Sequence, residues 1–265
     1  MPHKTVGAVS LYYEWYPAIA ATAGPPILLL HGLGSCSQDW PLQLPAFTER
    51  REVLAVDLQG HGQSARPAGT CTIHDLAADV AGLLAALRIP QVDLVGLSLG
   101  GCVGLQFALD FPQWLRRLVL VNTFAALRPR DLRSLVNLAG RSVRYRLGGL
   151  QGLAEYIARD LFPQPDQQEL YRQAVARLLS NDPRAYRAVT NAVLRFDVRR
   201  DLPRISAPTL VIAGLNDHTV PLSAKRLLAA RIPNARLVLI PRSGHATPYD
   251  QPEVFNRLVL EFLES

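Results

Sequence analysis

Gly96-Leu97-Ser98-Leu99-Gly100, followed by Gly101, is the most informative stretch of this 265-residue chain. It follows the pattern Gly-x-Ser-x-Gly and lies between a short apolar run, residues 92–95, and a helical pattern, residues 102–111. A serine on a sharp turn between a buried strand and a helix holds its hydroxyl exposed, as a nucleophile requires. Glycines flank it because a Cβ atom would clash with the neighbouring strand and helix. The stretch therefore predicts Ser98 as a nucleophile, with helix amides near any negative charge that develops.

Short apolar runs of the same kind recur along the chain and predict strands buried on both faces of a parallel sheet. They are rich in Val, Ile and Leu and lie at residues 27–30, 53–56, 92–95, 118–121, 210–212 and 237–240. Helical patterns at residues 74–87, 102–111 and 250–263 alternate with them. Residues 6–16 alternate in polarity and predict an exposed antiparallel strand. The predicted class is α/β, with a doubly wound, mostly parallel sheet.

The alternation of strands and helices stops between residues 125 and 204. This stretch has no convincing strand, but it has helical segments at residues 167–179 and 184–196, the second with Asp182-Pro183 as a start signal. We interpret it as a helical cap inserted between two strands of the core. The predicted domains are therefore a core, residues 1–124 and 205–265, and a cap, residues 125–204.

The composition favours one globular domain in a reducing compartment. Hydrophobic residues make up 49% of the chain and charged residues 19%, which excludes a disordered protein. The cysteines Cys36, Cys71 and Cys102 are odd in number and widely spaced, so neither a disulfide framework nor a metal cluster is expected. We find no secretory leader pattern and no apolar run near the ~20 residues that cross a bilayer. A cytoplasmic location fits best.

The net charge of +6 is concentrated in the predicted cap. Residues 125–200 hold 14 Arg and 7 acidic residues, whereas the rest of the chain has a net charge of −1. The excess could attract an anionic substrate or surface, but we favour a solvated helical face in a chain that uses Arg rather than Lys. Without a helix-turn-helix, RRM-like or zinc-ligand pattern, nucleic-acid binding is not expected.

A serine nucleophile needs a base, and the base needs a carboxylate to fix its tautomer. His245 follows the run at residues 237–240, and Asp217 follows the run at residues 210–212. Both lie where a strand of an open α/β sheet ends, which is where such sheets assemble their sites. The other position at which such folds place the acid is Asn122, which cannot be an anion. We therefore predict His245 as the general base and Asp217 as its orienting acid.

Acyl transfer also needs donors for the oxyanion that forms. His31-Gly32-Leu33-Gly34 follows the run at residues 27–30, so the backbone N–H of Leu33 is one candidate. The backbone N–H of Leu99, the residue after the nucleophile, is the other. The side chain of His31 is expected to be structural.

Together these residues resemble the α/β-hydrolase family, specifically its small, capped, single-domain members. The resemblance runs over nearly the whole chain and includes residues 28–34, 55–64, 94–101, 118–123, 214–221 and 243–263. The chain order Ser, Asp, His is the order that the family implies. Serine as nucleophile argues against haloalkane dehalogenases and epoxide hydrolases, which use Asp there.

The resemblance also implies structural roles for the turn that contains Asp57, Gly60, His61, Gly62 and Ser64. Two departures from the family pattern are small. Leu99 replaces the commoner Met, and Tyr249-Asp250 stands for the acidic residue usual before the final helix.

The function we predict is hydrolysis of a carboxylic ester or lactone through an acyl-enzyme on Ser98, with no metal or organic cofactor. The partner is a small-molecule substrate, without nucleic acid or membrane, and the oligomeric state stays open. The pattern is similar to the 3-oxoadipate enol-lactonase group, whose carboxylate-bearing substrate would suit a basic cap. Alternatives are a C–C bond hydrolase of a vinylogous diketone, a perhydrolase-type enzyme, or a non-catalytic small-ligand receptor. The predicted pocket residues are Leu33, Trp40, Phe124, Leu127, Tyr145, Tyr156, Phe162 and Val220.

Overall fold

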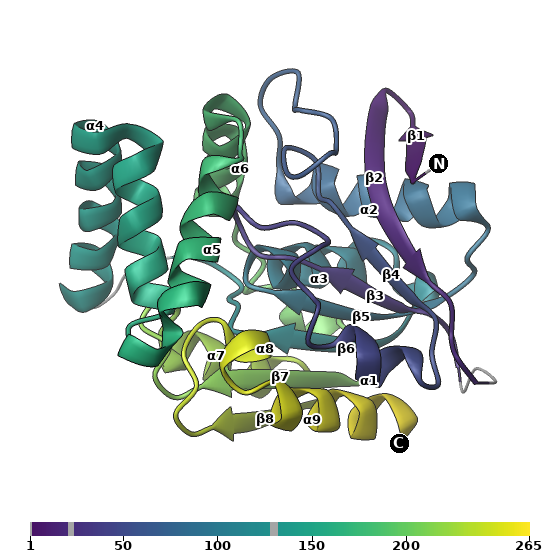
Figure 1. Cartoon of the computed structure of the whole chain (residues 1–265). Helices are drawn as coiled ribbons and strands as arrows, with labels where there is room; N and C mark the ends of the chain where they lie inside the picture. The colour runs from purple at the N-terminus through teal and green to yellow at the C-terminus, as the bar shows by residue number, and fades with distance from the viewer. Residues whose placement is uncertain (1, 21–23, 128–131) are drawn as a thin grey trace.

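An eight-stranded sheet crosses the centre of the molecule (Figure 1). The computed structural model describes residues 2–20, 24–127 and 132–265, without the side chains of residues 132–139 and 141–142. Only the pairs β1–β2 and β2–β4 are antiparallel, and the remaining pairs are parallel. In spatial order the strands are β1 (His3–Val6), β2 (Val9–Tyr16), β4 (Val53–Val56), β3 (Ile27–Leu30), β5 (Val92–Leu97), β6 (Leu115–Val121), β7 (Thr209–Gly214) and β8 (Ala235–Ile240).

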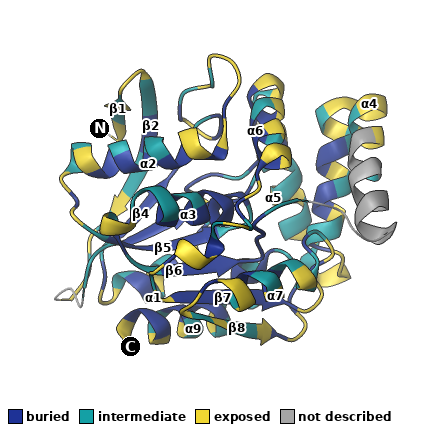
Figure 2. Cartoon of the chain, turned by 180° about the vertical axis from the view of Figure 1, so that it is seen from behind, coloured by how far each residue is buried: buried dark blue, intermediate teal, exposed yellow. Residues whose placement is uncertain are grey.

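Helices cover both faces of the sheet because successive strand residues point to opposite faces. Leu28 and Leu30 pack in one cluster with α2 (Ile73–Leu87), α3 (Leu99–Asp110) and α7 (Leu222–Arg231), which lie in front in Figure 2. Ile27 and Leu29 pack in the other cluster with α1 (Leu44–Thr48) and α9 (Pro252–Glu264). The central strands β3 and β4 are therefore buried on both faces, whereas the edge strand β8, predicted to be buried likewise, leaves Leu239 exposed. The predicted doubly wound, mostly parallel α/β class is confirmed.

Three helices between β6 and β7 form a layer beside the sheet (Figure 1). They are α4 (Leu132–Leu161), α5 (Gln168–Leu179) and α6 (Pro183–Arg195), with the 3₁₀ turn η2 (Pro165–Gln167) between α4 and α5. Gly149, with φ +59° and ψ −148°, breaks α4 into two halves that lie side by side.

The inserted helices leave and rejoin the core at one place. Ala126 bridges Asp197, and the N–H of Val198 donates to the carbonyl of Ala125 at 2.9 Å. Val189 of α6 also packs into the core cluster beneath. The inserted helical region is thus observed, while the domain limits 1–124, 125–204 and 205–265 stay a proposal.

The element ends differ from the predicted ones at a few places. The predicted exposed strand at residues 6–16 is two strands joined at Gly7, whose φ is +57°, and its residues Leu11 and Tyr12 are buried. The predicted helix at residues 102–111 begins at Leu99, directly after the nucleophile turn. The last predicted helix, residues 250–263, corresponds to α9 (Pro252–Glu264), and a short helix, α8 (Thr247–Asp250), precedes it.

Candidate active site

Ser98 lies on the turn between β5 and α3 with a backbone conformation that is unusual for a residue with a side chain. Its φ is +53° and its ψ is −109°. Such a conformation costs on the order of 1–3 kcal/mol and persists only where the surroundings impose it. Here the Ser98 N–H donates to the carbonyl of Val121 at 2.9 Å, and the Thr123 hydroxyl donates to the Ser98 carbonyl at 2.6 Å. The ends of β5 and β6 thereby hold the serine in place.

The glycines around Ser98 are required by close backbone contacts. A Cβ on Gly96 would lie 2.3 Å from the carbonyl oxygen of Gly100, and one on Gly100 would lie 2.1 Å from that of Leu30. A Cβ on Gly101 would lie 2.6 Å from the side chain of Thr123. The steric role that the sequence predicted for these glycines is therefore present in the structure.

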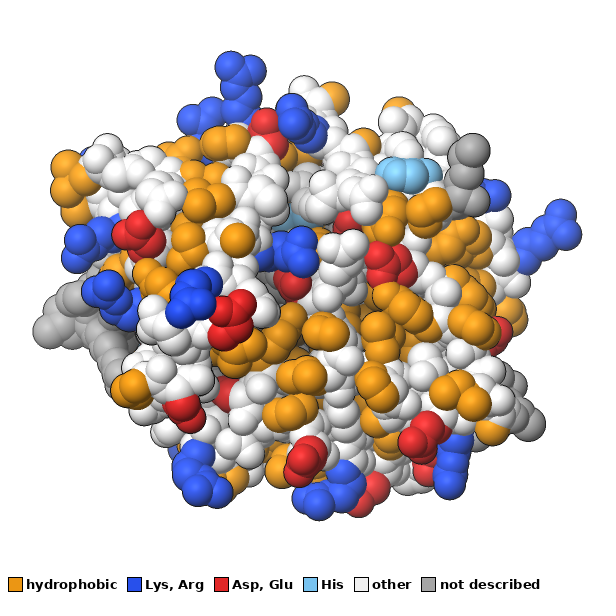
Figure 3. Space-filling model, viewed as in Figure 1, with side chains coloured by type: hydrophobic (Ala, Val, Ile, Leu, Met, Phe, Trp, Pro, Cys, Tyr) orange, Lys and Arg blue, Asp and Glu red, His pale blue; other side chains and the backbone are white. Residues whose placement is uncertain are grey.

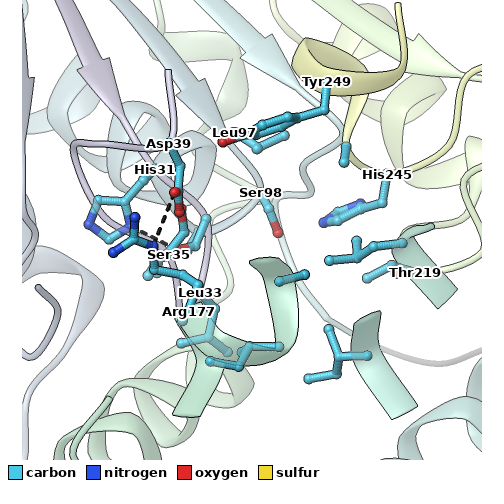
Figure 4. Close-up of a pocket in the computed structure, with 18 of the residues that line it drawn as sticks. His31, Leu33, Ser35, Asp39, Leu97, Ser98, Arg177, Thr219, His245 and Tyr249 are labelled. Carbon is cyan, nitrogen blue, oxygen red and sulfur yellow. Dashed lines mark hydrogen bonds and ion pairs between the residues drawn. The ribbon is translucent and has the colours of Figure 1, made fainter. Parts of the chain in front are cut away.

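His245 and Asp217 meet above the carboxyl ends of β7 and β8. The Nδ1 of His245 lies 3.0 Å from Oδ2 of Asp217. Because Nδ1 contacts Asp217, Nε2 is the ring nitrogen that can face the cavity. Figure 4 shows the ring of His245 pointing toward Ser98. The structure thus brings the three predicted residues together from three strand ends.

The Asp217 carboxylate is buried and accepts four hydrogen bonds. Oδ1 accepts from the N–H groups of Thr219 at 2.8 Å and Val220 at 3.0 Å. Oδ2 accepts from His245 and from the Nζ of Lys225, which lies 2.6 Å away. Burial alone would raise the pKa of Asp217, but His245 and then Lys225 hold it well below its usual range. The acid is therefore ionised whenever the protein is folded near neutral pH.

Sequence reasoning missed Lys225. It lies on α7, eight residues after Asp217, and its side chain is fully buried. A lysine in a helix is usually solvated, so nothing in the sequence marked this one.

Asn122 and Asp250 support the loop that carries His245. The Nδ2 of Asn122 lies 3.0 Å from the carbonyl of Gly244, 2.9 Å from that of His245 and 2.8 Å from the hydroxyl of Thr247. Its Oδ1 accepts the N–H of Gly214 at 2.9 Å. Asp250 accepts from the N–H of Gly244 at 2.6 Å. The residue excluded as an acid is thus a brace between the ends of β6 and β7 and the histidine loop.

The predicted oxyanion donors lie on two segments beside Ser98. Leu33 and Leu99 both line the cavity that contains Ser98. The N–H of Gly100 donates to the carbonyl of His31 at 3.0 Å, which joins the Leu33 loop to the start of α3. Leu99 is the first residue of that helix, where amides have no partner within the helix. The assignment of these two N–H groups stays a proposal.

The His31 side chain has structural contacts. Its Nε2 accepts the N–H of Leu58 at 3.0 Å, so its Nδ1 carries the proton toward the carbonyl of Gly32, 2.8 Å away. Burial lowers the pKa of His31, which stays neutral. Its ring is also packed edge to face on that of His61.

A cavity of about 600 Å³ lies over Ser98, between the sheet and the inserted helices. Among its described lining residues are Leu33, Trp40, Phe124, Leu127, Phe162 and Val220, all of which the sequence placed there. Tyr145 and Tyr156 are not on its wall. Tyr145 packs on the cluster between α4, α5 and α6, and the ring of Tyr156 lies 5.9 Å from the guanidinium of Arg144. The kink at Gly149 turns these tyrosines toward other cap residues. Aromatic positions that the sequence did not indicate, Tyr186 and Tyr249, line the cavity instead.

The cavity is mainly apolar and nearly neutral. The charged groups among its described lining residues are Arg177 and Asp39, whose Nε and Oδ1 are 3.1 Å apart (Figure 4). Asp39 also accepts from the hydroxyl of Ser35 at 2.5 Å. On the described part of the face in Figure 3, basic side chains over the inserted helices alternate with acidic ones. On this face the described arginines of the cap are therefore spread over its surface.

Two features of the described residues bear on cofactors and membranes. No group of three His, Cys, Asp or Glu side chains there is arranged to hold a metal ion. None of the helices in that part of the chain is both long and apolar enough to cross a bilayer. The three cysteines are free and buried.

Comparisons with known proteins agree with this geometry. Residues 25–252 match the family described as alpha/beta hydrolase fold. A putative carbamate hydrolase RutD of Stutzerimonas stutzeri is 35% identical and covers 96% of each chain, and a 3-oxoadipate enol-lactonase 2 of Acinetobacter baylyi is 29% identical over 92% of this chain and 90% of that relative. The crystal structure of the enol-lactonase from Burkholderia xenovorans superposes with a TM-score of 0.90 at 28% identity, with full coverage of both chains.

Proposed function

The chain belongs to the α/β hydrolase fold family, and from this premise we propose that it hydrolyses a carboxylic ester or lactone through an acyl-enzyme on Ser98. One observation carries the proposal. His245, held by Asp217 at 3.0 Å, lies on the wall of the cavity that Ser98 also lines, on its strained turn. Serine, base and oriented carboxylate are the parts that acyl transfer requires.

In the proposed mechanism His245 removes the hydroxyl proton of Ser98 while Oγ attacks the carbonyl carbon of the substrate. The N–H groups of Leu33 and Leu99 stabilise the negative oxygen of the tetrahedral intermediate. The intermediate collapses to the acyl-enzyme, and His245 gives its proton to the departing alcohol. Water, deprotonated by His245, then attacks the acyl carbon, and the acid leaves as Ser98 regains its proton. Asp217 stays ionised and stabilises the imidazolium at each step.

Within this class we propose a neutral acyl group as the substrate. The cavity wall is mainly apolar, and its Arg177 is paired with Asp39, so a carboxylate-bearing substrate would have to compete for that arginine. Breaking a partly buried pair and desolvating a second carboxylate opposes binding. This favours neutral esters or lactones over the anionic enol-lactone that the basic cap first suggested.

A second candidate is hydrolysis of a carbamate. A carbamate presents an acyl carbon to the same nucleophile, and relatives that span nearly the whole chain at 32–35% identity are named putative carbamate hydrolases. The rate panel below includes this class for that reason.

The test is a rate panel with the purified chain and its Ser98→Ala variant. The panel contains short and long p-nitrophenyl esters, a neutral lactone, a carboxylate-bearing enol-lactone, a carbamate and a vinylogous diketone. We expect the fastest turnover with a neutral ester or lactone and a loss of about 10⁴-fold or more in kcat for Ser98→Ala. Turnover by Ser98→Ala near the wild-type rate would refute the proposal. Tight binding with no product over many hours would favour a receptor instead.

A further inference from the structure

Lys225 is a fully buried cation that the mechanism above does not use. Its side chain and that of Asp217 are both 0% exposed, and its Nζ lies 2.6 Å from Oδ2 of Asp217. The Nδ1 of His245 lies 3.0 Å from the same oxygen. A buried ammonium carries a desolvation penalty of several kcal/mol, and an apolar residue of this size avoids that penalty. The buried ammonium of Lys225 and the imidazole of His245 therefore contact the same oxygen atom of Asp217, so the charge lies close to the proposed base.

We propose that Lys225 is a positioning residue that makes His245 harder to protonate by sharing the Asp217 carboxylate with it. This inference rests on the proposed function, because it concerns the base of that reaction. A positive charge close to the imidazole disfavours a second one, and in a buried site that interaction is only weakly screened. With Lys225 in place, His245 stays neutral, and so able to accept the Ser98 proton, at lower pH.

The hydrogen-bond pattern makes the sharing direct. The other carboxylate oxygen of Asp217 is taken by the N–H groups of Thr219 and Val220. Lys225 and His245 therefore donate to one oxygen, and each weakens the hold of Asp217 on the other. Burial lowers the pKa of Lys225 while Asp217 opposes that shift, as expected for an ammonium held by one carboxylate.

Two acidic groups near the pair act in the direction opposite to Lys225. Asp250 of α8 faces Asp217 and His245 closely enough that both influence its pKa, and Asp160 of α4 accepts from the hydroxyl of Thr219 at 2.8 Å. Without Lys225, the carboxylates of Asp217 and Asp250 would act on His245 without this opposing charge, an arrangement that favours its protonation. The other titratable or charged groups on the surrounding elements are Asp39, Arg177, His218, Tyr249, Asp201, Arg204 and Arg236.

The experiment compares Lys225→Met and Lys225→Gln with the wild type. Met removes the charge and the donor, while Gln removes the charge and keeps a donor for Asp217. The profile of kcat/KM against pH is measured with the neutral p-nitrophenyl ester that the wild type turns over fastest. In both variants we expect the acid limb to move to higher pH by about one unit, so that activity below the limb falls about 10-fold further than in the wild type.

Two outcomes would overturn the inference. One is an acid limb that stays in place or moves to lower pH in both variants. The other is a shifted limb in Lys225→Met and a wild-type limb in Lys225→Gln, which would assign Lys225 a hydrogen-bonding role without electrostatic effect. Gln is the milder replacement and keeps the test open if Lys225→Met does not fold, as checked by circular dichroism.

Arg51→Met is the matched control, since it also removes a fully buried cation that pairs with a carboxylate. It is expected to leave the limb unmoved. Failure of the proposed function gives a different result: the wild type itself then shows no turnover that depends on Ser98. If esters are poor substrates, the same limb is read from the rate at which a fluorophosphonate labels Ser98.

Discussion

Two buried carboxylates, those of Asp93 and Asp217, lie at opposite ends of the parallel strands and differ in their basic partners. Asp93 lies at the start of β5 and is paired with Arg51 and with Arg116, whose Nε lies 2.8 Å from its Oδ1. Asp217 lies beyond the end of β7 and is paired with Lys225 and His245. Both carboxylates are 0% exposed, and each has two basic partners.

The partners decide what each cluster can do. Arginine stays protonated under all ordinary conditions, and hydrogen bonding to Asp93 raises the pKa of Arg116 further. The Asp93 cluster is therefore a fixed link between the turn before β4, strand β5 and strand β6. Histidine changes its charge near neutral pH, and the Asp217 cluster lies where the strands end and the cavity begins. Burial of a carboxylate is common to both, so partner type and strand end distinguish a structural pair from a reactive one.

The largest expected effects come from substituting each of the two carboxylates. Asp217→Asn is expected to lower kcat by about 10⁴-fold, because the imidazole loses its correct tautomer and its counter-charge. Asp93→Asn leaves two arginines without their carboxylate and should lower the free energy of unfolding by about 3 kcal/mol or more, with kcat unchanged. The measurements are kcat with a neutral ester and urea unfolding. Equal losses of kcat in the two variants would contradict the division of roles.

Arg51→Met should have a smaller effect on the same structural pair. Arg116 still neutralises Asp93 in this variant, so the free energy of unfolding is expected to fall by about 2 kcal/mol. The side chain also donates to the carbonyl of Pro25, a contact that is lost with it. Urea unfolding measures the loss, and kcat/KM at neutral pH serves as the control. A change in kcat/KM of more than a few-fold would show that the two ends of the sheet are coupled.

Asn122→Ala tests the brace between the strand ends and the histidine loop. Without the three donor contacts of its Nδ2, the loop that carries His245 should sample more positions, and kcat should fall about 10- to 100-fold while KM changes little. Asn256→Ala is the matched control, a buried asparagine that donates to the carbonyl of Leu42 away from the cavity. Similar effects of the two variants on kcat would contradict a positioning role for Asn122.

The sequence predicted the candidate catalytic residues best, because each of them directly follows a predicted strand. The turn around Ser98 has close backbone contacts that only glycine allows, and Asp217 and His245 each follow an apolar run, so a local pattern located all three. It could not locate Lys225, because only the packing of α7 on β7 and β8 brings that side chain beneath the carboxylate.

The cavity wall shows a second limit of sequence reasoning. The kink at Gly149 in α4 decides which side of each half-helix meets the cavity, so Tyr145 and Tyr156 could not be separated from Tyr186 and Tyr249 by pattern alone. A helical repeat shows that a face is apolar and leaves open which neighbour it meets.

His31 and His61 are buried titratable groups whose hydrogen bonds in the described structure go to backbone groups and not to a carboxylate. Their ring centroids are 5.0 Å apart, and burial lowers the pKa of His61 to about 3. An unfolded histidine titrates near 6.5, so between about pH 6.5 and 3 the unfolded chain binds one more proton at this site than the folded chain does. The free energy of unfolding must then decrease as pH falls through that window, by about 1.4 kcal/mol per pH unit for each such group.

The depressed pKa of Asp217 acts in a different window. It contributes stability that is present above the unfolded value near 3.9 and is lost only as pH falls through the folded value.

Between pH 7.5 and 5 the free energy of unfolding of a His61→Gln variant should therefore fall by about 2 kcal/mol less than that of the wild type, whatever its stability at pH 7.5. Urea unfolding of both proteins at the two pH values measures this difference. Asp79, whose pKa is raised to about 6 by burial, acts with the opposite sign but equally in both proteins, so it cancels. Equal losses in the two proteins would mean that His61 takes up its proton in the folded protein over the same pH range as in the unfolded chain, and that a buried histidine here needs no carboxylate to hold its charge.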